Sequence, residues 1–266
     1  MMHKQNLHSH TIYCDGKNTV EEMVQTAIEK GFHTLGFSGH GFYEPDSFTM
    51  NEERETAYRN DVLCAKEKYK DKISIFLGIE EELDGKRYSK SDYDFVIGSV
   101  HHVHNPVDES KAIMQQEIET YYHNDFLAYA KDFYEKVEAY AHRDEVDIIG
   151  HLDLIMKFNE NEQFCQFDDP QYLAYAYHCI DTLIAADKIF EINTGAIARG
   201  YRTTPYPHSS LLKYICKQGG KICINSDCHN KDYLDCAYDL AYQIAREAGF
   251  TTQMILTESG FIEIEL

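Results

Sequence analysis

The 266-residue sequence has no tryptophan, only five prolines, and no apolar run near the length of a membrane span. A membrane-crossing helix needs about 20 mostly apolar residues, so we expect no insertion into a membrane. The prolines are too scattered to mark an interdomain linker, and neither internal repeats nor low-complexity tracts occur. We therefore expect one domain over residues 1–266.

Basic residues are scarce relative to acidic ones. The sequence has 25 Lys and Arg against 45 Asp and Glu, a formal net charge of −20. Nucleic acids and anionic membrane surfaces are normally bound by basic patches, and no run of basic residues occurs here. The charge therefore argues against both partners. Acidity is common among cytoplasmic enzymes, and part of it is available to bind metal ions.

The cysteines do not form a redox or secretory pattern. None of the eight belongs to a C-x-x-C pair, and the N-terminal segment MMHKQNLHSH lacks the apolar core of a signal peptide. We expect reduced thiols and a cytoplasmic location. The sequence does not indicate an oligomeric state.

Short apolar runs alternate with helical patterns along the chain, as in repeated βα units. We predict strands at 6–10, 33–40, 73–80, 94–102, 146–153, 188–194 and 221–229. Helices are predicted at 19–30, where Thr19 and Glu22 form a capping box, and at 51–70, 113–142, 169–186, 208–218 and 232–248. The tail 254–266 is predicted to form a final hairpin or strand. Seven strands in this order favour an α/β barrel.

Residues that can bind metal ions stand at the ends of these strands. In α/β barrels, residues at the carboxyl ends of different strands converge on one site. His8 and His10 are two residues apart, so both imidazoles project from one side of an extended strand, and the same spacing joins Asp227 and His229. Single candidates at the intervening strand ends are His40, Glu80, His101 and His151.

The candidate ligands outnumber the positions of one tetrahedral metal site. Adding Asp15 makes nine, which suffices for two or three sites with open positions. Glu80 and Asp15 are the bridging candidates, because a carboxylate can bind two ions and a neutral imidazole cannot. We expect two or three divalent metal ions, with zinc as the first choice and manganese or iron(II) as alternatives.

Seven segments in order, NLHSHTIYCDG, FSGH, GIEEE, GSVHH, GHLDL, EINT and NSDCH, resemble the PHP (polymerase and histidinol phosphatase) superfamily over essentially the whole chain. The resemblance implies a distorted (β/α)7 TIM-like barrel with a trinuclear metal centre at the C-terminal ends of the strands. It also implies three metal sites, formed by His8, His10, Glu80 and Asp227, by Glu80, His101 and His151, and by Asp15, His40 and His229.

The length and the segments GSVHH, GHLDL and EINTGAIARG resemble the stand-alone L-histidinol-phosphate phosphatases of that superfamily. This resemblance implies hydrolysis of a small-molecule phosphate ester, L-histidinol phosphate, to L-histidinol and orthophosphate in histidine biosynthesis. A hydroxide bridging two metal ions is expected to attack phosphorus. The leaving alcohol would take its proton from a metal-bound water, Asp15 or a neighbouring histidine, and the sequence does not choose among them.

Several residues outside the ligand set are candidates for binding the substrate. Arg199 is the leading phosphate donor because a guanidinium group can bind two oxygens at once, although a surface role in its loop is the alternative. Arg202 and Lys157 are further phosphate candidates, and His208 is expected at the pocket rim. Glu81 or Glu82 is a candidate partner for a cationic histidinol group.

Two other functions remain open at this point. A metal-dependent nuclease would use the same superfamily scaffold, but it should carry Lys and Arg along a groove, and the charge of −20 argues against it. A non-catalytic regulatory module would hold its metal ions in closed coordination, with no position open to water.

Overall fold

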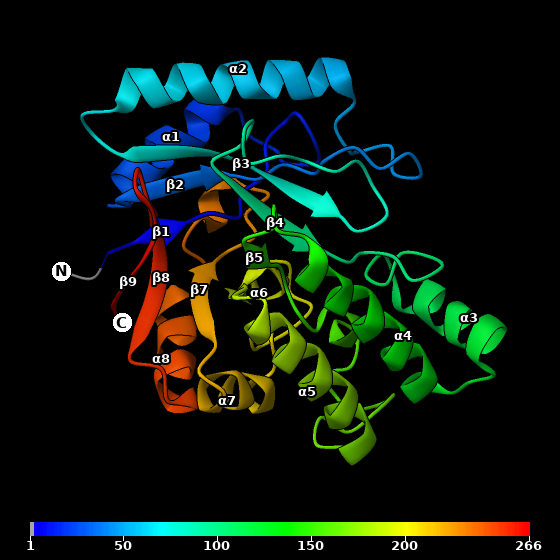
Figure 1. The fold of residues 1–266 in the computed structure, drawn as a ribbon. Helices are drawn as coiled ribbons and strands as arrows, with labels where there is room; N and C mark the ends of the chain where they lie inside the picture. Colours follow the sequence, from blue (N-terminus) through cyan, green and yellow to red (C-terminus); the bar gives the residue numbers. More distant parts are fainter. Residues whose placement is uncertain (1–2) are drawn as a thin grey trace.

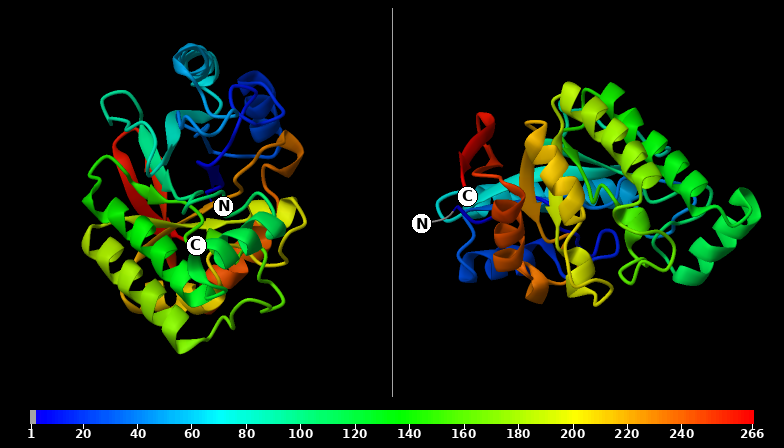
Figure 2. Two further views of the ribbon diagram at one scale, coloured as in Figure 1. Left: turned by 90° about the vertical axis from the view of Figure 1, so that its right-hand side faces the viewer. Right: turned by 90° about the horizontal axis from the view of Figure 1, so that it is seen from below.

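The computed structural model describes residues 3–266. Its central element is a parallel sheet of seven strands in chain order: β1 (Gln5–Asn6), β2 (Thr34–Phe37), β3 (Ser74–Glu82), β4 (Phe95–Ser99), β5 (Ile148–Ile149), β6 (Ile189–Asn193) and β7 (Lys221–Asn225). The sheet curves into a nearly closed barrel, and the helices lie outside it (Figure 1; Figure 2). The predicted distorted (β/α)7 barrel is confirmed.

The barrel closes where its first and last strands meet. Ser9 and Cys228, just beyond β1 and β7, form a parallel bridge. Nearer the strands, the side-chain oxygen of Asn6 accepts a hydrogen bond from the Ser226 backbone N–H at 3.0 Å, and its amide donates to the Ser226 hydroxyl at 3.0 Å. This seam brings the two ends of the sequence together, so residues that follow β1 and β7 share one site.

Apolar side chains fill the inside of the barrel. The ring of Phe95 packs against Gly36 on β2 and Gly78 on β3, where an added Cβ atom would overlap it. Met254 and Leu256 join the same cluster from an antiparallel hairpin, β8 (Thr252–Thr257) and β9 (Gly260–Glu265). The predicted terminal hairpin is confirmed, and it extends the barrel interior.

The helices begin and end largely where capping signals predicted. They are α1 (Val20–Glu29), α2 (Glu52–Tyr69), α3 (Lys111–Tyr122), α4 (Phe126–Glu138), α5 (Pro170–Ala185), α6 (Gly195–Ala198), α7 (Ser209–Lys217) and α8 (Tyr238–Ala248). The Thr19–Glu22 capping box is present at α1. Helices α1 and α2 cover one side of the barrel, and α3 to α5 cover another (Figure 1; Figure 2).

Two predicted helices are wrong in their extent. The stretch 113–142 is split into α3 and α4, because His123 and Asn124 have φ angles of 52° and 67°, which end a helix. A 3-10 turn follows α4 at Ala139–His142. The helix predicted from residue 232 begins only at Tyr238, after a separate 3-10 turn over Lys231–Tyr233.

No helix within residues 3–266 has the length and apolarity that crossing a bilayer requires. All eight cysteines are free thiols. The expectation that residues 1–266 form a single domain stays a prediction.

Candidate metal centre

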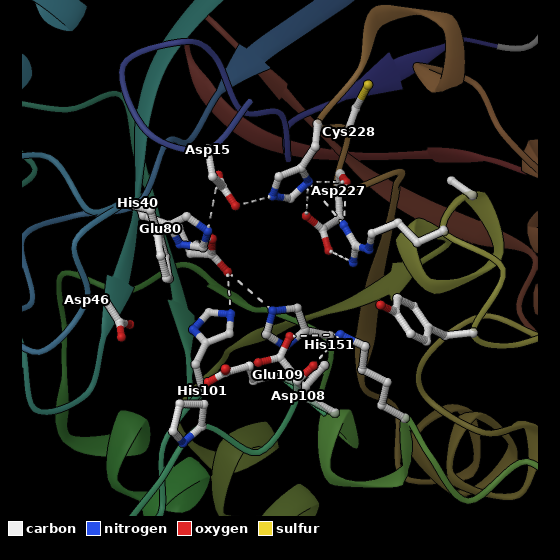
Figure 3. A pocket seen from close by; sticks show the side chains of 18 of the residues that line it. Asp15, His40, Asp46, Glu80, His101, Asp108, Glu109, His151, Asp227 and Cys228 are labelled. Carbon is white, nitrogen blue, oxygen red and sulfur yellow. Dashed lines mark hydrogen bonds and ion pairs between the residues drawn. The ribbon is translucent and has the colours of Figure 1, made fainter. Parts of the chain in front are cut away.

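A cavity of about 670 Å³ opens at the C-terminal ends of the barrel strands. The side chains of Asp15, His40, Glu80, His101, His151 and Asp227 point into one shared space, whereas the sulfur of Cys228 points away from it (Figure 3). Seven of the nine predicted ligands line it: Asp15, His40, Glu80, His101, His151, Asp227 and His229. The other two, His8 and His10, are fully buried and contact these residues from beneath. The structure therefore brings all nine predicted ligands together.

One group of donor atoms has the spacing of a single coordination sphere. His8 Nε2 lies 3.3 Å from Glu80 Oε2 and 3.7 Å from Asp227 Oδ1. His10 Nε2 lies 3.6 Å and 3.3 Å from the same two oxygens. Ligands about 2.0–2.1 Å from a tetrahedral zinc ion stand about 3.3–3.4 Å apart. His8, His10 and Asp227 therefore fit one divalent ion, and Glu80 contacts both histidines at the edge of this group.

Three atoms of this group are buried without a hydrogen-bond partner: His8 Nε2, His10 Nε2 and Glu80 Oε2. Each buried polar atom left unpaired costs about 1–3 kcal/mol, so native proteins rarely leave several together. A metal ion bound between these atoms would satisfy all three. The donor set thus fits the divalent ions that the sequence predicts.

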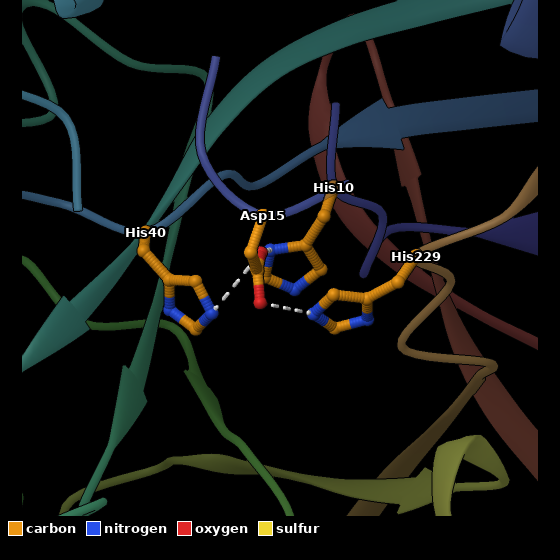
Figure 4. Close-up of side chains that lie close together, drawn as sticks. All are labelled: His10, Asp15, His40 and His229. Atoms are coloured by element: carbon orange, nitrogen blue, oxygen red, sulfur yellow. Dashed lines mark ion pairs between the residues drawn. The ribbon is translucent and has the colours of Figure 1, made fainter. Parts of the chain in front are cut away.

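A second group surrounds Asp15 (Figure 4). Its Oδ1 lies 3.4 Å from His10 Nδ1 and 3.6 Å from His40 Nε2, and its Oδ2 lies 3.1 Å from His229 Nε2. Asp15, His40 and His229 are the set that the family resemblance implies for one site. His10 lies within reach of this group as well as of Glu80.

Glu80 stands between the first group and a third. Its Oε1 lies 3.3 Å from His151 Nε2 and 3.6 Å from His101 Nε2, while its Oε2 lies 3.0 Å from His40 Nδ1. His40 therefore faces both Glu80 and Asp15, although the resemblance assigns it to the Asp15 site alone. The position of Glu80 is the one expected of a bridging carboxylate.

Asp227 and His229 reach the cavity by a different route from the predicted one. The β7 ladder ends at Asn225, and Asp227 has a φ of 48°, so the pair does not lie on an extended strand. A bend in the chain, rather than strand alternation, turns both side chains inward. Arg199 donates to Asp227 Oδ2 at 2.9 Å and so contacts the oxygen that does not face His8.

The electrostatics of the chain without metal separate the ligands into two kinds. Burial lowers the pKa of His10, as do His229 and His40, to about 3, so its imidazole is neutral. Burial raises the pKa of Asp227, but Arg199 and His8 outweigh it and hold that pKa well below its usual range. These are the protonation states that metal binding requires.

His101 differs from His10. Burial lowers its pKa, but the carboxylates of Glu80 and Glu82 outweigh burial and raise the pKa to about 9. At neutral pH the imidazole of His101 in the metal-free chain is therefore protonated on both nitrogens, and metal binding has to displace one of these protons.

The predicted substrate residues divide into two sets. Arg199 and Lys157 line the cavity. Lys157 is anchored by the backbone oxygen of Asp108 at 2.6 Å and lies over the Tyr201 ring, 4.5 Å from its centroid.

Arg202, His208 and Glu81 are absent from the wall of this cavity as the described residues form it. Arg202 is buried over the Tyr206 ring, and His208 is the N-cap of α7. Strand alternation turns Glu81 away from Glu80, and it forms an ion pair with Arg143 at 2.9 Å.

Four other residues of the site, Asp46, Asp108, Glu109 and Glu191, were not predicted, and Glu82 was predicted only as a possible partner of a cationic substrate group. Asp46, Asp108 and Glu109 line the cavity from loops after β2 and β4, where no strand periodicity marks them (Figure 3). Glu82 accepts a hydrogen bond from His101 Nδ1 at 2.9 Å, and Glu191 lies 2.7 Å from His8 Nδ1. Both glutamates stand two residues from another inward side chain, so alternation from Glu80 and Asn193 was the signal that could have found them.

Comparison with known proteins agrees with this geometry. Residues 6–195 match the PHP domain family. A "probable histidinol-phosphatase" from Schizosaccharomyces pombe is 27% identical over 95% of this chain and 89% of its own length. Another from Deinococcus radiodurans is 26% identical over 92% of this chain and 94% of its own.

A solved structure has the same fold. The histidinol phosphate phosphatase of Lactococcus lactis subsp. lactis, crystallised with zinc, L-histidinol and phosphate, superposes with a TM-score of 0.74 at 20% identity, covering 97% of this chain and 98% of that one. The match over residues 6–195, more than half of the sequence, shows the family. The chain belongs to the PHP domain family.

Proposed function

We propose that this chain is a metal-dependent phosphomonoesterase that hydrolyses L-histidinol phosphate to L-histidinol and orthophosphate in histidine biosynthesis. The observation that carries the proposal is the convergence of nine histidine and carboxylate side chains from the strand ends on one cavity, with three buried donor atoms left unpaired. The substrate is supported by two relatives, each called a probable histidinol-phosphatase and each matched over most of its length.

Bound metal ions would make the cavity attractive to a phosphate ester. Its wall carries six carboxylates, those of Asp15, Asp46, Glu80, Asp108, Glu109 and Asp227, and three basic side chains, those of Lys17, Lys157 and Arg199. In the metal-free chain, burial lowers the pKa values of His40 and His101, but nearby carboxylates outweigh burial, raise both pKa values and favour the charged forms. Divalent ions would replace these protons and add positive charge where a phosphate dianion binds, and zinc is the first candidate because imidazole and carboxylate both suit it.

Divalent ions bound here would acidify water for attack on phosphorus and neutralise charge on the phosphoryl oxygens. The chain's own residues position the ester. Arg199 donates from Nη2 to Asp227 Oδ2, and its Nη1 contacts the Asp227 backbone oxygen and His229 Nδ1. A guanidinium group has five N–H donors, so those that remain can bind phosphate oxygens. Lys157, held by Asp108, adds a fixed positive charge at the same wall.

Asp15 is proposed to act as an ionised metal ligand rather than as the acid that protonates the leaving alcohol. Burial raises its pKa, but the histidines His40 and His229 outweigh burial and hold the pKa well below its usual range. A carboxylate of such low pKa is a weak base and stays ionised, which suits it to bind a cation. The proton of the leaving alcohol is therefore assigned to a metal-bound water or a neighbouring histidine.

The test is phosphate release by purified protein reconstituted with zinc, manganese or iron(II). The panel holds L-histidinol phosphate, sugar phosphates, nucleotides and short oligonucleotides. We expect the highest kcat/KM for L-histidinol phosphate. Preferred cleavage of oligonucleotides would favour the nuclease alternative, and bound metal with no phosphate release from any ester would favour the non-catalytic module. The absence of nucleic-acid partners and the cytoplasmic location stay predictions.

A further inference from the structure

Glu191, in the middle of β6, lies beneath the cavity and is fully buried. Four nitrogen atoms surround its carboxylate. His8 Nδ1 and Asn225 Nδ2 lie 2.7 Å and 3.0 Å from Oε1, and the His151 backbone nitrogen and Asn193 Nδ2 lie 2.9 Å and 2.8 Å from Oε2. One carboxylate thus joins β6 and β7 to the segments after β1 and β5. These two segments carry the candidate metal ligands His8 and His151.

Three of these four groups cannot exchange their donor role for an acceptor role. The donor of His151 is a backbone N–H. The side-chain oxygen of Asn225 accepts from the Leu7 backbone N–H at 2.7 Å, and that of Asn193 accepts from the Gly195 backbone N–H at 2.8 Å. Turning either amide would break one of these bonds and set two donors against each other. The His8 ring alone can change its tautomer.

We propose that Glu191 is a positioning residue that holds the proton of His8 on Nδ1, so that the Nε2 lone pair is presented to a metal ion. An ionised carboxylate only accepts hydrogen bonds, so the ring nitrogen beside it has to be the donor. The other ring nitrogen, Nε2, is the buried unpaired atom that lies 3.3 Å from Glu80 Oε2. The inference rests on the proposed metal centre.

Replacing Glu191 by Gln is informative because no orientation of the amide suits the site. An NH2 group on the Oε2 side faces the fixed donors of His151 and Asn193. On the Oε1 side it faces Asn225 and His8, and only His8 can adapt, by moving its proton to Nε2. That tautomer blocks the nitrogen that the proposed metal centre uses.

Glu82 provides a matched control. Its Oε2 accepts from His101 Nδ1 and from the His101 backbone N–H, both at 2.9 Å, while its Oε1 is buried without a partner. In Glu82→Gln the amide oxygen can keep both bonds, and the NH2 group takes the position that no donor faces. The variant removes the same charge from a neighbouring carboxylate without reversing a histidine tautomer.

The experiment compares zinc content after dialysis and zinc affinity by chelator competition for wild type, Glu191→Gln and Glu82→Gln. We expect Glu191→Gln to weaken the affinity of one zinc ion about 10–100-fold, and Glu82→Gln, which keeps both bonds to His101, to weaken zinc affinity clearly less. Equal affinity in Glu191→Gln and wild type would overturn the inference. A wild-type protein that binds no zinc would instead overturn the proposed metal centre.

A double variant separates orientation from packing. In Glu191→Gln with Asn225→Asp, the carboxylate at position 225 accepts from both the introduced amide at position 191 and the Leu7 N–H. The network is then complete again, but His8 still faces a donor. We expect Glu191→Gln alone to unfold at a lower urea concentration than wild type. In the double variant the urea midpoint of unfolding should return toward the wild-type value, while zinc affinity stays low. Recovery of both would assign Glu191 a packing role and overturn the inference.

The wild-type protein supplies a check that needs no folded variant. Imidazole 15N shifts of His8 in the zinc-loaded protein should show a protonated Nδ1 and a metal-bound Nε2. Metal bound through Nδ1 would contradict the proposal.

Discussion

Replacing Glu80 by Gln tests the bridging carboxylate on which the proposed centre depends. Each Glu80 oxygen lies within 3.6 Å of imidazole nitrogens, those of His8, His10 and His40 for Oε2 and those of His101 and His151 for Oε1. The Ser99 hydroxyl donates to Oε1 at 2.6 Å and favours the amide oxygen on that side. The amide nitrogen then faces the first group of ligands, where it cannot bind a cation.

The expected loss of kcat/KM in Glu80→Gln follows from the number of metal ions that Glu80 is proposed to bind. A metal ion contributes several kcal/mol of transition-state stabilisation, and a loss of about 4–5.5 kcal/mol lowers kcat/KM by about 10³–10⁴-fold. His151→Asn removes one terminal donor and should cost less. Phosphate release and elemental analysis are measured together on metal-replete protein. Unchanged turnover in Glu80→Gln would refute the bridging role.

Three further predictions concern substrate binding, pH and packing. Arg199→Ala should raise KM for the phosphate ester or lower kcat while zinc content stays constant; loss of zinc would instead assign Arg199 to the support of Asp227. In metal-free protein, burial lowers the pKa of His101 but the adjacent carboxylates raise it to about 9, so its stabilising effect is complete below about pH 6.5 and is lost as the pH rises through 9. Zinc affinity, measured by competition, should therefore increase from pH 7 to 9, and a flat profile would count against this coupling. Gly78→Ala should lower the free energy of unfolding by about 1–3 kcal/mol in urea titrations, because its Cβ would overlap the Phe95 ring; an unchanged midpoint would show that the ring can move aside.

The ligands could be predicted because strand ends are visible in sequence. His40, Glu80 and His151 each follow an apolar run, and the parallel order of the strands brings these positions to one end of the barrel. His8 follows a polar segment and was found through its pairing with His10. Predicting that the ligands converge therefore required only the strand positions and the family resemblance. The conformations of the loops between the strands were not needed.

What the sequence did not reveal depends on local backbone geometry and on partners far away in the chain. The left-handed conformations of His123 and Asn124 interrupt the stretch 113–142. Asn124 and Asp125 are residue types common at helix ends, but composition alone did not locate the break. Arg202 is a cation in a loop next to Arg199, yet it packs over Tyr206 outside the cavity wall. The role inferred for Glu191 depends on contacts with His8 and Asn225, which no local pattern encodes.

The central claim is that ligands from the whole length of the chain bind several divalent ions in one cavity. A crystal structure of zinc-loaded protein, with anomalous data on both sides of the zinc edge, tests it most directly. We predict two or three anomalous peaks within about 2.0–2.3 Å of donor atoms from His8, Glu80, His151, Asp227 and the other proposed ligands. Under metal-rich conditions, the absence of any peak among these side chains would contradict the account.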